Sequence, residues 1–213
     1  MTSQIVRALA VAACTLALAS PVLAQADGQN SQRIASGQWA LDGSVGFAVP
    51  VGDFGSTLNT GLDVMGAVEY RPAATGGIYF RAEVGHSGFG YSTTSEFISL
   101  GNPSPGSVSA WRFAANGLYD FETHSPLQVY ALAGLGLYHL TNTFDLCGTA
   151  PFTSCSQSTN GIGFNLGAGL RYPINPIQLF FELRYQLALS APFGVGNAPY
   201  FPFQFGVRYL LPR

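Results

Sequence analysis

The chain has 213 residues, of which 47% are hydrophobic, 13% aromatic and only 9% charged, and its formal net charge is −2. Soluble proteins carry about 25% charged residues, so this composition argues against an ordinary water-exposed surface. The balance of charge also excludes a basic surface for nucleic acid, and the apolar excess indicates that part of the surface meets lipid.

The first residues have the form of a secretory signal peptide. A single cation, Arg7, precedes an apolar run over 8–18, and the run ends in the small-residue pattern Val22-Leu23-Ala24. This order of charged, apolar and small segments is typical of an export signal that is removed from the mature protein. We predict cleavage after Ala24, with Ala26 as the alternative.

Two cysteines, Cys147 and Cys155, follow the signal. An exported chain meets an oxidising compartment, so we predict a disulfide between them. No histidine lies between or beside them, which argues against a metal site. The third cysteine, Cys14, lies in the apolar run of the signal, where we interpret it as a small apolar residue; an acylated lipoprotein cysteine is the alternative.

The rest of the chain alternates between apolar and polar residues with a period of two, which is typical of a strand with one apolar face. In the first such segment, Trp39, Leu41 and Val45 share one phase, whereas Asp42 and Ser44 share the other. The eight segments are 39–51, 62–71, 78–84, 111–120, 127–140, 162–172, 177–189 and 201–211. The fifth is apolar on both phases, so its facing stays open.

In the other seven segments, every charged residue falls on one phase and the opposite phase is apolar or aromatic. The charged phase holds six acids and six arginines: Asp42, Asp63, Glu69, Glu83, Asp120 and Glu182, with Arg71, Arg81, Arg112, Arg171, Arg184 and Arg208. Buried charges must be paired, and arginine bridges several carboxylates while staying charged. We therefore predict a salt-bridge network inside a closed barrel.

The lengths of the segments and of their connections support this fold class. No apolar run after the signal approaches the ~20 residues of a spanning helix, whereas ~10 residues suffice for a tilted spanning strand. Short links over 72–77, 121–126 and 173–176 alternate with longer ones such as 88–107 and 141–160. We predict an all-β, eight-stranded antiparallel up-and-down transmembrane β-barrel over 37–213, preceded by a signal peptide (1–24) and a short periplasmic tail (25–36).

Aromatic residues on the apolar phase lie near one end of the predicted strands. They are Trp39, Tyr70, Tyr119, Tyr172 and Tyr209. Amphipathic rings suit the level of the lipid headgroups, so we predict a periplasmic aromatic girdle. A soluble lipocalin-like barrel with its apolar face inward is the alternative architecture.

With these segments, the chain resembles the small outer-membrane β-barrel proteins, the group of the OmpA-type transmembrane domain and related porin-like proteins. The resemblance covers residues 37–211 and rests on the eight segments and the ending "FQFGVRYLL". It implies a bacterial outer-membrane location, contact with outer-membrane lipid, and a last strand read by the barrel-assembly machinery. The implied assembly signal comprises Phe203, Phe205, Val207, Tyr209 and Leu211.

The predicted function is non-enzymatic: a barrel with a plugged polar lumen that contributes to envelope structure and interacts through its external loops. The loop closed by the cysteines and the last loop, with Phe193 and Tyr200, are the candidate surface for an extracellular ligand. A protease-resistant cap without a ligand is the other interpretation, because a short disulfide loop often serves only to limit disorder. Porin-like diffusion of small solutes is the alternative. A lipid-modifying enzyme and a lipocalin-like carrier are further interpretations.

The enzyme interpretation depends on the three histidines, His86, His124 and His139. Two of them are followed directly by serine, which in a strand faces the other way. His139 shares a face with Thr141, but no acid is evident near this pair. We predict no catalytic residue, metal or cofactor.

Overall fold

The computed structural model describes residues 36–73, 77–91, 106–147, 153–174, 176–189 and 196–212. The predicted signal peptide and the tail up to residue 35 lie outside the described residues.

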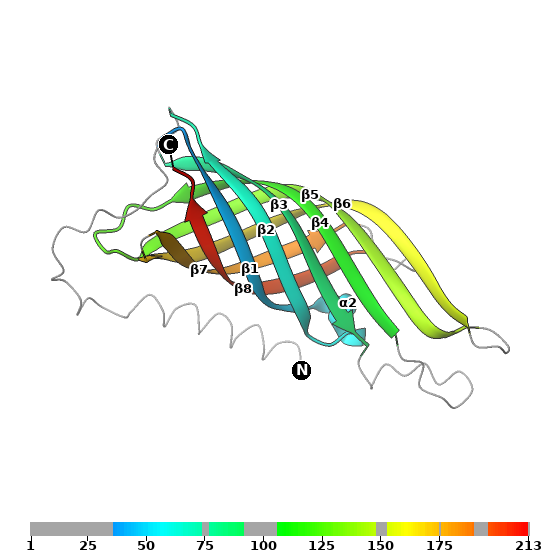
Figure 1. The fold of residues 1–213 in the computed structure, drawn as a ribbon. Helices are drawn as coiled ribbons and strands as arrows, with labels where there is room; N and C mark the ends of the chain where they lie inside the picture. The colour runs from blue at the N-terminus through cyan, green and yellow to red at the C-terminus, as the bar shows by residue number, and fades with distance from the viewer. Residues whose placement is uncertain are drawn as a thin grey trace. The chain divides into compact units, whose positions relative to one another are not determined.

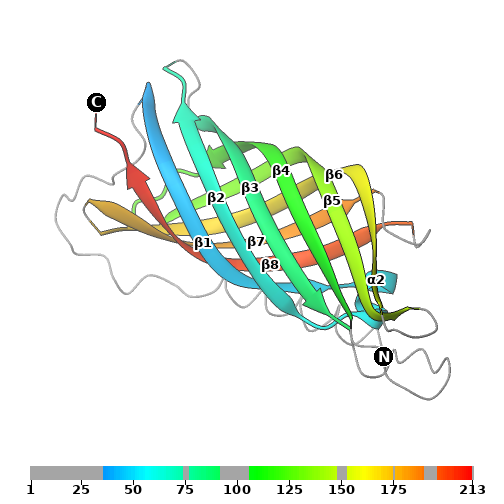
Figure 2. The same ribbon diagram turned by 45° about the vertical axis from the view of Figure 1, so that its right-hand side comes forward.

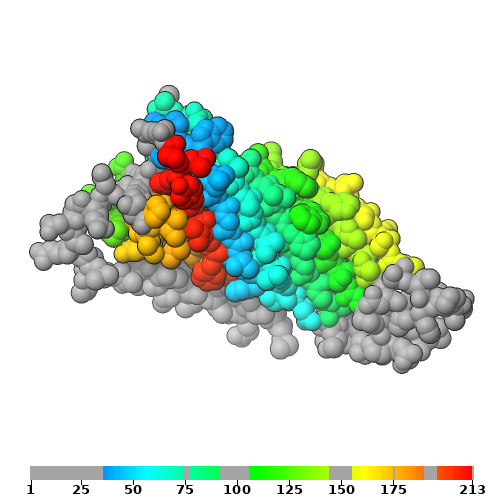
Figure 3. Space-filling view, in the orientation of Figure 1, coloured from blue at the N-terminus to red at the C-terminus, as the bar shows by residue number. Residues whose placement is uncertain are grey.

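Eight antiparallel strands close into a barrel, in which each strand pairs with its neighbours in sequence and β8 pairs with β1. Figures 1 and 2 show the ring of tilted strands, and Figure 3 shows β8 (red) lying directly against β1 (blue). The predicted fold class is confirmed. The strands are β1 (Gln38–Pro50), β2 (Gly61–Arg71), β3 (Ile78–Gly90), β4 (Gly106–Asp120), β5 (Gln128–Cys147), β6 (Thr153–Ile174), β7 (Ile177–Ala188) and β8 (Ala198–Leu210).

The alternation of the sequence becomes an inner and an outer surface, because successive side chains of a strand point to opposite faces. In β3, Arg81 and Glu83 point inward and are buried, whereas Phe80 points outward and is exposed. The structure also decides the facing of β5, which the sequence left open. Tyr130 is buried in the lumen, and Leu135 is exposed on the outer face.

Strands β5 and β6 are longer than predicted, with 20 and 22 residues. The prediction of a loop over 141–160 was therefore wrong for most of that segment. Cross-strand pairs such as Thr141 with Ser158 and Thr143 with Ser156 continue the ladder beyond the apolar part of the barrel. The polar composition suggested a loop, but threonine favours strands. Paired strands that extend beyond the lipid do not need an apolar outer face.

A short helix, α2 (Gly52–Thr57), joins β1 to β2 at the end of the barrel opposite the C-terminus (Figures 1 and 2). No sequence pattern predicted it. Its Phe54 side chain is buried and meets the ring of Phe89 edge-on at 5.5 Å, and Phe89 meets Tyr200 in the same way at 5.5 Å. We call this the α2 end of the barrel and the other the terminal end.

The apolar cluster at the α2 end corrects one prediction about the last loop. Tyr200, predicted as an exposed loop residue, lies in β8 with 1% of its surface exposed. Its position is on the inward phase of a strand that begins earlier than predicted, at Ala198. Phe193, the other predicted loop aromatic, lies outside the described residues.

Among the described residues, no α-helix is both long enough and apolar enough to cross a membrane.

Candidate functional site: the ion-pair network inside the barrel

The charged phase of the strands lies inside the barrel. Eleven of the twelve predicted lumen residues are buried: Asp42, Asp63, Glu69, Arg81, Glu83, Arg112, Asp120, Arg171, Glu182, Arg184 and Arg208. The twelfth, Arg71, is half-buried where β2 ends, opposite Gln38 of β1. Seven of the eight strands contribute a charged member of the buried set, so its contacts join segments that are far apart in sequence.

The half of the network nearer the α2 end is centred on Arg112. Its Nη1 and Nη2 atoms donate to the two carboxylate oxygens of Asp63 at 2.7 and 3.2 Å, a bidentate arrangement that adds both strength and orientation. Its Nε lies 3.4 Å from Glu83 Oε1. Both oxygens of Glu83 accept from Arg184 Nη1, at 2.6 and 2.7 Å.

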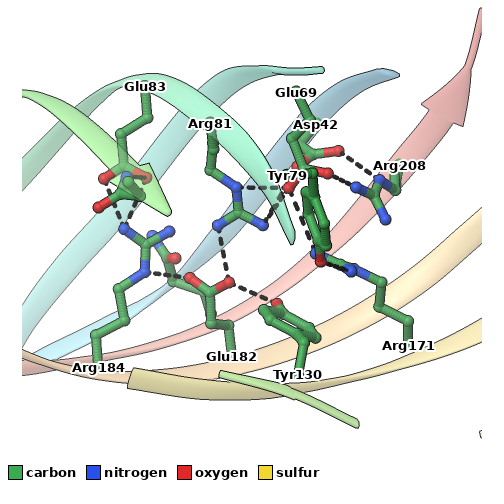
Figure 4. Close-up of polar contacts among 12 residues, drawn as sticks. Asp42, Glu69, Tyr79, Arg81, Glu83, Tyr130, Arg171, Glu182, Arg184 and Arg208 are labelled. Carbon is green, nitrogen blue, oxygen red and sulfur yellow. Dashed lines mark hydrogen bonds and ion pairs between the residues drawn. The ribbon is translucent and has the colours of Figure 1, made fainter. Parts of the chain in front are cut away.

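Glu182 joins this half to the next one. One of its carboxylate oxygens accepts from Arg184 Nε, and the other accepts from Arg81 Nη1 at 2.8 Å (Figure 4). Arg81 in turn donates from Nε to Glu69 Oε1 at 2.7 Å, and its Nη2 lies 3.4 Å from Asp42. The two halves thus form one connected set of ion pairs.

Glu69 is the centre of the half nearer the terminal end. Besides Arg81, it contacts Arg171, 3.4 Å away, and Arg208. Arg171 also donates to Asp120 at 2.9 Å. Three guanidinium groups therefore share one buried carboxylate, as the converging side chains of Figure 4 show.

Two buried tyrosines also belong to the network, and the sequence did not single them out. Tyr130 donates to Glu182 at 2.5 Å, and the Arg171 guanidinium lies 3.7 Å from the centre of its ring. Tyr79 donates to Asp120 at 2.9 Å. A cation over an aromatic face is stabilised further when water is excluded. Tyr130 was missed because the facing of β5 was open. Tyr79 was missed because an aromatic residue, unlike a charged one, is equally common on the lipid-facing phase and so does not mark the inward phase.

The charges in this network are nearly balanced. The ion pairs join six carboxylates to five guanidinium groups, and each of the five arginines contacts at least two of the carboxylates. Isolated charges would be very costly inside a protein, so this mutual pairing is what permits their burial. The ion pairs therefore link buried side chains from seven strands to one another inside the barrel.

The five residues of the predicted aromatic girdle all lie on the outward phase near the terminal end. The rings of Trp39 and Tyr70, on paired strands, are 4.6 Å apart, and the ring of Tyr119 meets that of Phe121 at 5.2 Å. Their contact with lipid headgroups stays a prediction.

Four residues of the predicted assembly signal lie along the outer face of β8: Phe203, Phe205, Val207 and Tyr209. Phe203 stacks on Phe47 of β1 at 5.0 Å, and Phe205 lies 4.9 Å from Phe181 of β7. Leu211 follows the strand, and its backbone amide donates to the Trp39 carbonyl at 3.0 Å. Recognition by the assembly machinery stays a prediction.

A closed antiparallel barrel with an apolar exterior and an ionic interior defines the class of bacterial outer-membrane barrels. The model of the outer membrane protein beta-barrel domain matches residues 10–209. The chain therefore belongs to this family, and it is a protein of the bacterial outer membrane.

Solved structures with the same fold are distant in sequence. Neisserial surface protein A is 19% identical, with a TM-score of 0.58 over 80% of this chain and 96% of that one. A major outer membrane protein from Thermus thermophilus is 14% identical, with a TM-score of 0.62 over 83% and 100%. Ail, the attachment invasion locus protein of Yersinia pestis, is 15% identical, with a TM-score of 0.52 over 83% and 99%. No curated protein matches the chain in sequence.

Proposed function

We propose that this chain is a closed, non-conducting barrel that contributes to the structure of the outer membrane and interacts with ligands through its external loops. The observation that supports this proposal is the connected network of six carboxylates and five guanidinium groups across the lumen. An ion path needs sites that are open and weakly binding, and a pore selective for one charge usually has a ring of one sign. Here carboxylates and guanidinium groups are paired with one another across the lumen.

The apolar cluster at the α2 end supports the same proposal. Phe54, Phe89 and Tyr200 meet edge to face in the barrel mouth, so a solute would meet a packed aromatic layer before it reached the charges. An eight-stranded barrel is just wide enough for its interior to be filled by side chains.

Single-channel recording in planar bilayers tests the proposal. We expect the refolded mature chain to give no steady conductance steps, because the network and the aromatic layer leave no continuous aqueous path. Reproducible steps of one size would contradict a closed lumen and would favour the alternative, porin-like diffusion of small solutes. A porin of known conductance in the same bilayers is the control for insertion and detection.

The loops at the α2 end are the proposed interaction surface, and we propose that this end faces the outside of the cell. The β5–β6 hairpin is the longest element there, because its ladder continues to the pair of Cys147 with Thr153. Its exposed residues between Cys155 and Asn160 are small and polar. Binding of a surface ligand to whole cells should fall when residues 141–160 are replaced by a short turn, whereas equal binding would place the ligand elsewhere.

We further propose that a disulfide joins Cys147 to Cys155 across this hairpin. The side chain of Cys147 lies outside the described residues, so the bond stays a prediction. We expect no labelling of the unreduced mature chain by a maleimide, and labelling of two thiols after reduction. Substitution Cys147→Ser should expose one thiol without reduction. Two labelled thiols in the unreduced chain isolated from outer membranes would disprove the bond.

A further inference from the structure

Four polar side chains form a square on the outer face of β5 and β6. His139 and Thr141 lie on β5, and Asn160 and Ser158 lie directly opposite them on β6. All four belong to the outward phase, so they lie on the outside of the barrel and away from the ion-pair network. The sequence placed His139 and Thr141 on one face but found no partner for the histidine. The pairing of β5 with β6 brings Asn160, from the segment predicted to be a loop, next to the histidine.

The hydrogen bonds of the square have one consistent direction. His139 Nδ1 lies 2.6 Å from the amide oxygen of Asn160, which has no proton to give, so Nδ1 is the donor. In the neutral ring Nε2 is then the acceptor, and Thr141 Oγ1, 3.2 Å away, donates to it. Because the single hydroxyl proton of Thr141 is used in this bond, Thr141 Oγ1 is the acceptor from Ser158 Oγ, which lies 3.0 Å away.

This order is that of a nucleophile, a base and an orienting group. A hydroxyl within hydrogen-bond reach of a histidine, whose other nitrogen is held by a third residue, is the general signature of an activated nucleophile. The third residue is an amide in some triads and a carboxylate in others, and triads are recognised by geometry rather than by sequence order.

The square lies at the edge of the apolar band. On β5 the outward side chains from Val129 to Leu137 are all apolar, and His139 is the first polar one. On β6 the outward side chains from Leu170 to Ile162 are apolar, and Asn160 is the first polar one. Because the apolar band of an outer-membrane barrel faces the hydrocarbon of the membrane, we infer that the square lies near the ester groups of the lipids, where the hydrocarbon ends.

An apolar groove leads from the square into the band. The groove has a volume of about 560 Å³ and is lined by His139 and Asn160 together with Phe113, Leu137, Tyr138, Gly161 and Ile162. A second groove of about 580 Å³ shares Phe113, Leu137 and Ile162 with it and continues over Ala82, Ala115 and Phe164. A groove of this size, with one polar end and apolar walls, matches an acyl chain whose ester lies at the polar end.

We propose that Thr141, His139 and Asn160 form a catalytic site that hydrolyses the acyl esters of outer-leaflet lipids, with the acyl chain held in the adjoining grooves. The assignment to the outer leaflet rests on the proposed orientation of the α2 end. His139 Nε2 takes the proton of Thr141 Oγ1 as Oγ1 bonds to the ester carbonyl carbon. The ester C–O bond breaks, and the departing oxygen takes the proton from Nε2, which leaves the acyl group on Thr141.

Water completes the reaction. Nε2 takes a proton from a water molecule, whose oxygen bonds to the acyl carbon. The bond to Oγ1 breaks, Oγ1 recovers the proton, and the fatty acid leaves. Asn160 is a positioning residue, since it holds the ring in the tautomer that can accept. The Ser158 hydroxyl can turn from Oγ1 to the carbonyl oxygen as that oxygen becomes negative.

The test is ester hydrolysis by the refolded mature chain, with p-nitrophenyl palmitate in detergent micelles and with phospholipid vesicles. We expect release of nitrophenolate and of free fatty acid. The changes Thr141→Val and His139→Gln should each lower the rate by about 100-fold or more, because a nucleophile or a general base is lost. Thr141→Ser should keep activity. Asn160→Ala should lower the rate, and Asn160→Asp should restore it, since a carboxylate can also accept from Nδ1.

The matched control is His86→Gln. His86 is also an outward histidine beside Trp111, at a ring distance of 4.7 Å, but it lies on β3 outside the square. We expect this variant to hydrolyse at the rate of the unchanged chain. Heat-modifiable gel mobility verifies that each variant folds, so a loss of rate in a folded Thr141→Val barrel reports on chemistry.

Three results would overturn the proposal. One is hydrolysis by the unchanged chain no faster than by folded Thr141→Val, which would leave the prediction that the chain is not an enzyme in place. Another is loss of hydrolysis in Ser158→Ala with full hydrolysis in Thr141→Val, which would assign the nucleophile to Ser158. The last is a fluorophosphonate probe that labels the unchanged chain at a residue other than Thr141, as located by mass spectrometry of its peptides.

Discussion

Replacing Glu69 with glutamine is expected to lower the free energy of unfolding of the refolded barrel by about 3–5 kcal/mol. Glu69 contacts Arg81, Arg171 and Arg208, and the glutamate and the three arginines are buried. The amide keeps the size of the carboxyl group but removes its charge. Three guanidinium groups would then share less negative charge in a place that water does not reach, and a buried charge that loses its partner is strongly destabilising.

The measurement is urea unfolding in detergent micelles or lipid vesicles, followed by tryptophan fluorescence and gel mobility. The control is Glu122→Gln, the same change at an exposed residue that follows β4. It should alter stability by no more than about 0.5 kcal/mol, as surface substitutions generally do. Equal stability of the two variants would mean that the network contributes little, and the structural proposal would then lose its main support.

Replacing Gly85 with valine should also destabilise the barrel, by about 3 kcal/mol or more, through an indirect effect on the same network. Gly85 faces the lumen on β3, and a Cβ atom there would overlap the guanidinium group of Arg112. Arg112 would have to leave its position, and Asp63 and Glu83 would lose a buried partner. The absence of a side chain at Gly85 is thus required for the network, although a valine would otherwise favour a strand.

The matched control for this prediction is Gly66→Val. Gly66 lies on the outward phase of β2, and no atom lies within 4 Å of a Cβ built there. The same unfolding measurement should find this variant as stable as the unchanged barrel or slightly more stable. If both valines were tolerated, Arg112 would have another acceptable position, and the lumen would be less tightly packed than the structure indicates.

The barrel could be predicted because a strand in a membrane turns its apolar side chains outward to lipid and its charged side chains inward to the lumen. This arrangement is visible in the sequence as an alternation of the two kinds of residue. A strand between lipid and a narrow lumen needs an apolar side chain at every second position, and all seven assignable segments had it. The charged residues marked the inward phase, since a charge facing lipid costs several kcal/mol. Alternation therefore predicted seven of the eight strands and the inward position of Arg81 or Glu182.

The candidate site was predicted only in part. The charged members of the lumen could be named, but the sequence did not say which acid meets which arginine. That depends on the register between strands and on the curvature that brings β3 and β7 face to face, as with Arg81 and Glu182. Tyr130 was missed because β5 is apolar on both phases. Phe54 was missed because the six residues of α2 are too few to show a helical period.

The sequence by itself determined the class of fold, the number of strands and the two faces of seven of them. These features depend on local alternation and composition, because each strand has lipid on one face and the barrel lumen on the other. Only the tertiary structure decided the facing of β5, the length of the β5–β6 hairpin, the partners of each buried charge and the meeting of His139 with Asn160. Those are contacts between residues distant in sequence, and they exist only because closing the barrel sets the register of every strand against its neighbours.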